Sequence, residues 1–168
     1  MTIRLMFKRA ACVLPIFLAV YAQAAEESWS TCSMPTAPFR VQVPAILIHA
    51  TAATAGGCSF QTEDGQFNVE AVVQPGTETL DARMQKEIEL LSGKVDHKKK
   101  GDDWFLLSGV TPDGTEYFRK LFTQDGQWVT LRITYPHAER KKYSDWVKRI
   151  EKTFIPFAPI EKSTSQQE

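Results

Sequence analysis

The chain has 168 residues, of which 43% are hydrophobic, and its 20 basic side chains balance 20 acidic ones. This length and composition are typical of one globular domain with a sizeable core. The even charge balance argues against nucleic acid as the main partner, because binding to a phosphate backbone needs a basic surplus or stripe.

The first residues have the order of a secretory signal. A positive leading segment precedes the apolar run ACVLPIFLAVYA, and an Ala-x-Ala cleavage site follows at 22–24. The run is shorter than the ~20 residues that cross a bilayer. We therefore predict a cleaved signal peptide at 1–24 and a periplasmic or secreted protein of a Gram-negative bacterium. Without Arg4, Lys8 and Arg9, the mature chain would have a net charge of about −3 and no membrane span.

Two cysteines, Cys32 and Cys58, remain in the mature chain. An even count in an exported chain predicts a disulfide, which would stabilise the fold by about 3–4 kcal/mol in the chain-entropy model. Two buried thiols are the alternative. Residues 25–38 are polar with two prolines and predict an irregular N-terminal arm, which the bond would tie to a single domain at 39–156.

The first elements of that domain follow from the period of the apolar residues. A strand is expected near 45–50, and a hairpin over 58–73, where apolar and polar residues alternate. A stripe at helical spacing predicts a helix at about 78–92 with four apolar residues on one face: Leu80, Met84, Ile88 and Leu91.

Residues 94–135 have the pattern of a meander of strands. In the last strand, Val129, Leu131, Ile133 and Tyr135 share the side that should meet the helices, and Trp128 falls on the other side, which we expect to be exposed. An amphipathic helix follows Pro136, and 157–168 are expected to form a disordered tail. The predicted fold class is α+β, an antiparallel sheet of five or six strands with two helices on one face.

The motif Thr-x-Asp-Gly occurs three times, at 62–65, 111–114 and 123–126. Each copy lies between two strand-like segments. Asp-Gly suits a tight turn, because glycine adopts the positive φ that closes it, as in a type I turn. A calcium loop needs several carboxylates at alternating positions, and the three copies do not have them. The motif therefore predicts three hairpin turns rather than ligand loops.

Candidate catalytic residues are sparse. His49, His97 and His137 have no metal-ligand partner at the spacing of a recognised motif, and we expect His137 to contribute to a local helix cap. Ser108 lies beside a glycine but lacks the Gly-x-Ser-x-Gly frame of a nucleophile elbow. We predict no cofactor, no metal ligand and no catalytic constellation.

Basic residues offer a candidate docking surface for an acidic partner. Clusters occur at 98–100 and 140–142, and an aromatic residue among cations is a common interface anchor. The candidate partner-binding residues are Lys98, Lys99, Lys100, Arg119, Trp128 and Arg132. The alternative is an ordinary solvated face, because acidic residues flank both clusters.

Five segments resemble a family of uncharacterised exported proteobacterial proteins: DWFLLSG (103–109), GTEYFRK (114–120), TLRITYP (130–136), YSDWVKRIEKTF (143–154) and the upstream stretch at 43–73. The order of strands and helices is similar to the PsbP-like α/β/α sandwich. The resemblance implies a mostly non-enzymatic class of binding and assembly proteins. It also implies a third layer, formed by the N-terminal arm or by 154–160. It assigns no functional role to any residue of this chain.

These observations favour a non-catalytic periplasmic binding or accessory module with an unknown protein partner. One alternative is an immunity or inhibitor protein directed against a toxin or enzyme. A small hydrolase that combines Ser108 with His137 is a third interpretation.

Overall fold

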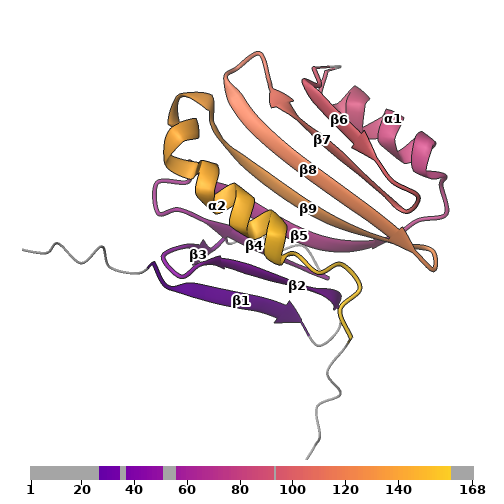
Figure 1. The fold of residues 1–168 in the computed structure, drawn as a ribbon, viewed down its shortest axis with the longest axis horizontal. Helices are drawn as coiled ribbons and strands as arrows, with labels where there is room; N and C mark the ends of the chain where they lie inside the picture. Colours follow the sequence, from indigo (N-terminus) through magenta and orange to yellow (C-terminus); the bar gives the residue numbers. More distant parts are fainter. Residues whose placement is uncertain (1–26, 35–36, 51–55, 93, 160–168) are drawn as a thin grey trace, which may run out of the picture.

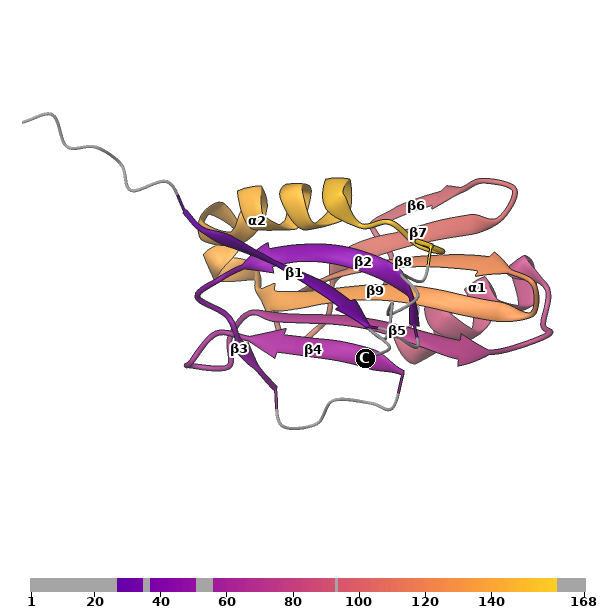
Figure 2. The ribbon, with the colours of Figure 1, turned by 90° about the horizontal axis from the view of Figure 1, so that it is seen from below.

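The structure is a computed structural model and describes residues 27–34, 37–50, 56–92 and 94–159. The segment expected to be a signal peptide lies outside the described residues. Three layers are present, with a large sheet in the middle (Figures 1 and 2). None of the helices in the described ranges is long and apolar enough to cross a membrane.

The central sheet has seven strands, and each neighbouring pair is antiparallel. In order across the sheet these are β3 (Ile48–His49), β4 (Gly57–Gln61), β5 (Asn68–Pro75), β9 (Gln127–Pro136), β8 (Thr115–Gln124), β7 (Trp104–Val110) and β6 (His97–Lys100). The sheet is larger than the five or six strands predicted. Its two edge strands are short, and all their residues are exposed. Neither strand therefore has the alternation of apolar and polar residues that identifies a strand with one buried face.

Helix α1 (Leu80–Leu90) covers one face of the sheet. The Thr79 side chain accepts a hydrogen bond from the N–H of Ala82 and so caps the helix start. The helix joins β5 to β6 at the far edge, so it crosses three intervening strands. Its apolar stripe packs on a cluster formed by Leu91, Phe105, Leu107, Tyr117, Leu121 and Trp128.

Helix α2 (Arg140–Thr153) lies on the opposite face, together with a two-stranded sheet of β1 (Trp29–Met34) and β2 (Ala37–Pro44). A short 3-10 turn at His137–Glu139 precedes α2. Tyr143 and Ile150 of the helix are buried against the sheet. The prediction that both helices lie on one face is therefore wrong. Strand β9 is central, and both of its faces are buried. The alternation of its apolar residues identified only one of these two faces as buried.

The segment 25–38 was predicted to be irregular, but its residues 29–34 form β1. The strand signal lies just downstream, where alternate residues of β2, such as Phe39 and Val41, are almost fully buried. Strand β2 ends at Pro44, and of the strand expected near 45–50 only Ile48 and His49 form β3. The third layer that the PsbP-like resemblance implied is thus the N-terminal hairpin together with α2.

A disulfide joins Cys32 of β1 to Cys58 of β4, as predicted. It links the small sheet covalently to the large one. The start of the predicted C-terminal tail also packs on the small sheet. The Ala158 N–H donates to the Pro38 carbonyl over 2.9 Å, and Ala158 is buried. Residues 160–168 lie outside the described residues.

All three Thr-x-Asp-Gly motifs form hairpin turns, as predicted. In the first two, the Thr62 and Thr111 hydroxyls donate to the aspartate two residues later, and the glycine has a positive φ. The third differs, because Asp125 and Gly126 both have positive φ, at 51° and 73°. Gln124 then pairs directly with Gln127, which is the geometry of a two-residue type I′ turn. Within the described ranges, no group of three or more His, Cys, Asp or Glu side chains is arranged to hold a metal ion.

Candidate functional site

The three predicted lysines form the edge strand β6 and are exposed. Lys100 pairs with Asp81 of α1. Charged side chains on an edge strand, lysine above all, prevent pairing with another sheet. The cluster therefore has a structural role as a protected edge. Its binding to a partner stays a prediction.

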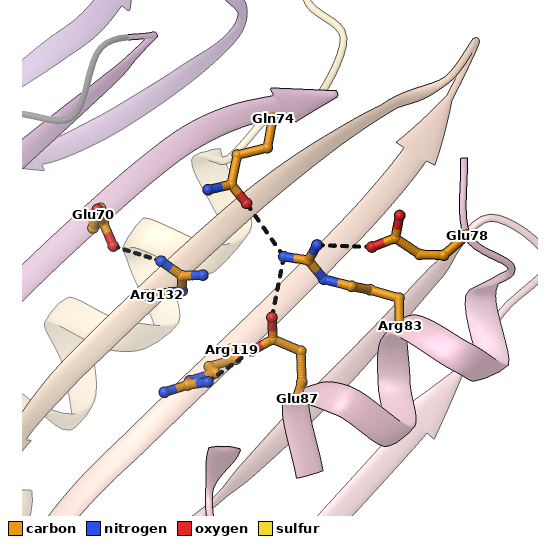
Figure 3. A network of polar contacts seen from close by, with 7 residues as sticks. All are labelled: Glu70, Gln74, Glu78, Arg83, Glu87, Arg119 and Arg132. Carbon is orange, nitrogen blue, oxygen red and sulfur yellow. Dashed lines mark hydrogen bonds and ion pairs between the residues drawn. The ribbon is translucent and has the colours of Figure 1, made fainter. Parts of the chain in front are cut away.

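Arg119 of β8 and Arg132 of β9 lie directly opposite each other in the sheet. Like charges in this arrangement repel, and each arginine has its own glutamate. Arg119 Nη1 lies 2.7 Å from Glu87 Oε2, and Arg132 Nη1 lies 3.0 Å from Glu70 Oε2 (Figure 3). The structure thus brings these two predicted residues together, with their charges compensated.

Helix α1 contributes the centre of this polar network. Its Arg83 guanidinium lies 3.0 Å from Glu78, 3.2 Å from Glu87 and 3.3 Å from the Gln74 side-chain oxygen (Figure 3). The Glu87 side chain is only 1% exposed, and it is shared by two arginines. Breaking such a buried pair leaves an uncompensated charge, which costs about 3–5 kcal/mol. The network therefore positions α1 on the sheet.

Trp128 is wrongly predicted as an exposed anchor, because it is 0% exposed. It lies beneath α1, where the Arg83 guanidinium is 5.6 Å from its ring centroid. Gly76 lies close to the indole, because a Cβ added there would lie 2.6 Å from Trp128 Cδ1. Its side of β9 looked polar in the sequence because Thr130 and Arg132 share it. The helix covers that side.

His137 contacts a carboxylate instead of capping a helix. Its Nδ1 lies 2.9 Å from Glu116 Oε2, and Arg140 Nε lies 3.4 Å from the other Glu116 oxygen. Burial, and then the charge of Glu116, raises the pKa of the neighbouring Tyr135 phenol well above its usual range. Ser108, the other residue of the hydrolase interpretation, lies in β7 opposite Phe118.

A cleft of about 610 Å³ opens where the β2–β3 connection, the β4–β5 turn and the start of α2 meet; we call it the end cleft. It is lined by Ile46, Ile48, Thr62, Glu63, Asp64, Lys142, Tyr143 and Trp146. Ile46 is 71% exposed and Ile48 is 48% exposed. Isolated exposed apolar residues are ordinary, but a contiguous apolar patch with a polar rim is typical of an interaction site.

The floor of the end cleft is rigid. The ring of Tyr143 packs 4.7 Å from that of Phe67, and the Trp146 indole lies edge-on to Phe67 at 5.2 Å between centroids. Trp146 Nε1 also donates to Glu27 Oε2 over 2.8 Å. Aromatic residues held in this way lose little conformational entropy when a partner binds. The cleft is suited to receive an apolar side chain of another protein.

The rim of the end cleft carries both signs of charge. Glu63 and Asp64 lie in the β4–β5 turn, and Lys142 lies on α2. Hydrogen bonds from Thr62 and then from the Gln66 N–H lower the pKa of the Asp64 carboxyl, so it is ionised at neutral pH. The side-chain contact of Lys142 with Tyr143 raises the pKa of the lysine, which therefore stays charged.

Sequence reasoning missed the end cleft. Ile46 and Ile48 were expected within the strand near 45–50, and their exposure is known only from the structure. Tyr143 and Trp146 lie on the apolar face of the last helix, which the sequence predicts to be amphipathic. Nothing local in the sequence indicates that residues near 46, 63 and 142 meet.

No protein-family model and no curated protein matches the sequence. The fold is similar to the solution structure of cyanobacterial PsbP (CyanoP) from Synechocystis sp. PCC 6803, with a TM-score of 0.58 and 12% identity over 83% of this chain and 99% of that one. A crystal structure of LpqN, involved in cell envelope biogenesis of Mycobacterium tuberculosis, aligns with a TM-score of 0.46 and 11% identity, over 80% of this chain and 91% of that one. The similarity to CyanoP shows that the chain has a PsbP-like fold.

Proposed function

We propose that this protein is a non-catalytic binding or accessory module of the bacterial envelope, and that it acts by protein–protein contact at the end cleft. The export-type leader in the sequence and the Cys32–Cys58 disulfide support an oxidising location outside the cytoplasm. The PsbP-like fold alone leaves the function open, since one fold serves many roles.

The observation that carries the proposal is the exposure of Ile46 and Ile48 on one cleft. Removing apolar surface from water contributes about 25 cal/mol per Å². Interfaces gain most from a few apolar and aromatic residues at their centre, surrounded by a polar rim. The end cleft has this composition, with rigid aromatic rings below and charges around it.

The test is chemical crosslinking of the protein at native level, followed by purification of its complexes from cells. We expect a defined complex for the wild type and its loss in Ile46→Asp. Leu90→Asp is the matched control, because Leu90 is also exposed, at 65%, but lies on α1. The proposal is wrong if the wild type is recovered without a complex, or if both variants retain it equally.

A further inference from the structure

The end cleft combines a protrusion and a recess on one surface. Ile46 projects into solvent, and the recess beside it is lined by the half-buried Trp146 and by Tyr143, which is itself fully buried. A surface that holds both shapes can fit a copy of itself. This matters because the commonest assembly of soluble proteins is a two-fold dimer, in which the same patch of both copies forms the interface.

The rim also carries charges that can complement each other across a dimer. Lys142 lies on α2 at one side of the cleft, and Glu63 and Asp64 lie in the β4–β5 turn at the other side. The dimer proposed here has its two-fold axis through the middle of the cleft and perpendicular to the line that joins these sides, so it exchanges them. It therefore places the lysine of each copy against the acidic turn of the other, and no like charges meet.

The two ends of the main sheet differ in their protection against association. Strand β6 has four exposed residues, of which three are lysines. Strand β3 has two exposed residues, Ile48 and His49, neither of them a lysine or an acid. Because exposed lysines deter edge contact, the β3 end is the one that the sequence leaves open to another molecule.

We infer that the protein which docks at the end cleft is a second copy of this chain, with Ile46 of each copy inserted into the cleft of the other. The inference rests on the proposed function, which assigns the cleft to protein contact. The lining of the cleft alone is smaller than a standard specific interface, so the contact must be weak and transient. We therefore expect a dissociation constant in the micromolar range, roughly 1–100 μM.

The test is analytical ultracentrifugation of the purified mature chain over about 1–500 μM, which brackets that range. We expect a monomer–dimer equilibrium for the wild type and for the control Leu90→Asp. Ile46→Asp should be monomeric throughout, and the milder Ile46→Ala should weaken the dimer at least tenfold. Circular dichroism confirms that each variant is folded.

Charge reversal tests the two-fold arrangement itself. Lys142→Glu and Glu63→Lys alone should each weaken the dimer about tenfold or more, because each brings like charges together at both ends of the interface. The double variant should bind at least about threefold more tightly than either single variant, because the pair at positions 63 and 142 is restored with reversed sign while Asp64 keeps its charge. Both side chains are exposed, so the fold tolerates the changes.

The inference is wrong if the wild type is a monomer over the whole range, if Ile46→Asp dimerises normally, or if the double reversal fails to rescue. Failure here is distinguishable from failure of the proposed function. A monomeric protein that forms an Ile46-dependent complex with a different protein in cells would overturn the dimer and retain the docking function. An Ile46-dependent dimer of the purified protein that forms no complex in cells would retain the dimer and overturn the docking function.

Discussion

The Glu87 carboxylate of α1 and the Arg119 guanidinium of β8 are joined over 2.7 Å, and the Glu87 side chain is only 1% exposed. Arg83, one turn earlier on the helix, is bound to the same carboxylate. This pair fixes where α1 lies on the sheet.

Glu87→Ala should therefore lower the free energy of unfolding by about 3–5 kcal/mol, because the partly buried Arg119 loses the carboxylate that it pairs with and the buried Arg83 keeps only Glu78. Urea denaturation measures the change. The exposed Glu89 is the control, and Glu89→Ala should change stability by less than about 0.5 kcal/mol.

The double variant Glu87→Leu/Arg119→Met distinguishes the contribution of the ion pair to stability from the contribution of side-chain packing. It should recover most of the loss, since a buried ion pair and an apolar pair of similar volume are often close in stability. A double variant as unstable as Glu87→Ala would contradict this account of the network.

Gly76→Ala should destabilise the fold by about 1–3 kcal/mol, because the new methyl group overlaps the buried Trp128 indole. Thermal or urea unfolding checks the value. Gly65→Asn is the control, since nothing lies within 4 Å of a Cβ there and asparagine tolerates a positive φ. Equal effects at the two glycines would show that Trp128 is not held as described.

The pKa of Asp113 should lie below its usual range, because the Thr111 hydroxyl and then the Thr115 N–H bind its ionised form. A depressed folded-state pKa stabilises the protein above the unfolded-state pKa, and the contribution is lost as pH falls through the folded-state value. Thr111→Val should raise the pKa of Asp113 in an NMR titration. Asp64, whose pKa is lowered by Thr62 in the same way, should be unchanged.

Replacing both Cys32 and Cys58 by serine should cost about 3–4 kcal/mol, because the bond closes a loop between residues 26 positions apart. Guanidinium unfolding with and without reductant measures it. The wild type should lose this stability when reduced, while the double-serine variant should not respond. A reductant effect on the serine variant would indicate another cause.

Several elements follow from the sequence because their signals are local. The Asp-Gly turns and the stripe of α2 are of this kind. The turn at 125–126 even sets the register that places Arg119 opposite Arg132, since Gln124 pairs with Gln127. The glutamates that compensate these arginines are not local. They come from β5 and α1, and only the tertiary fold places them.

The exposed or buried state of a strand face is also not local. Alternation in β9 separates two faces but does not reveal that a helix covers each of them, so Trp128 was misplaced. The end cleft shows the same limit, because its walls come from the β2–β3 connection, the β4–β5 turn and α2. None of these three segments has an unusual sequence. The combination of apolar, aromatic and charged side chains in the end cleft arises only because the fold brings the segments together.

The most direct measurement of docking at the end cleft uses a photoreactive amino acid in place of Ile46, in cells that produce the protein at native level. Irradiation should give one adduct of defined mass, and the same probe in place of Leu90 should not give it. Mass spectrometry then identifies the attached chain, which we expect to be a second copy. If position 46 gives no adduct, or only the adducts seen from position 90, the end cleft is not a docking surface.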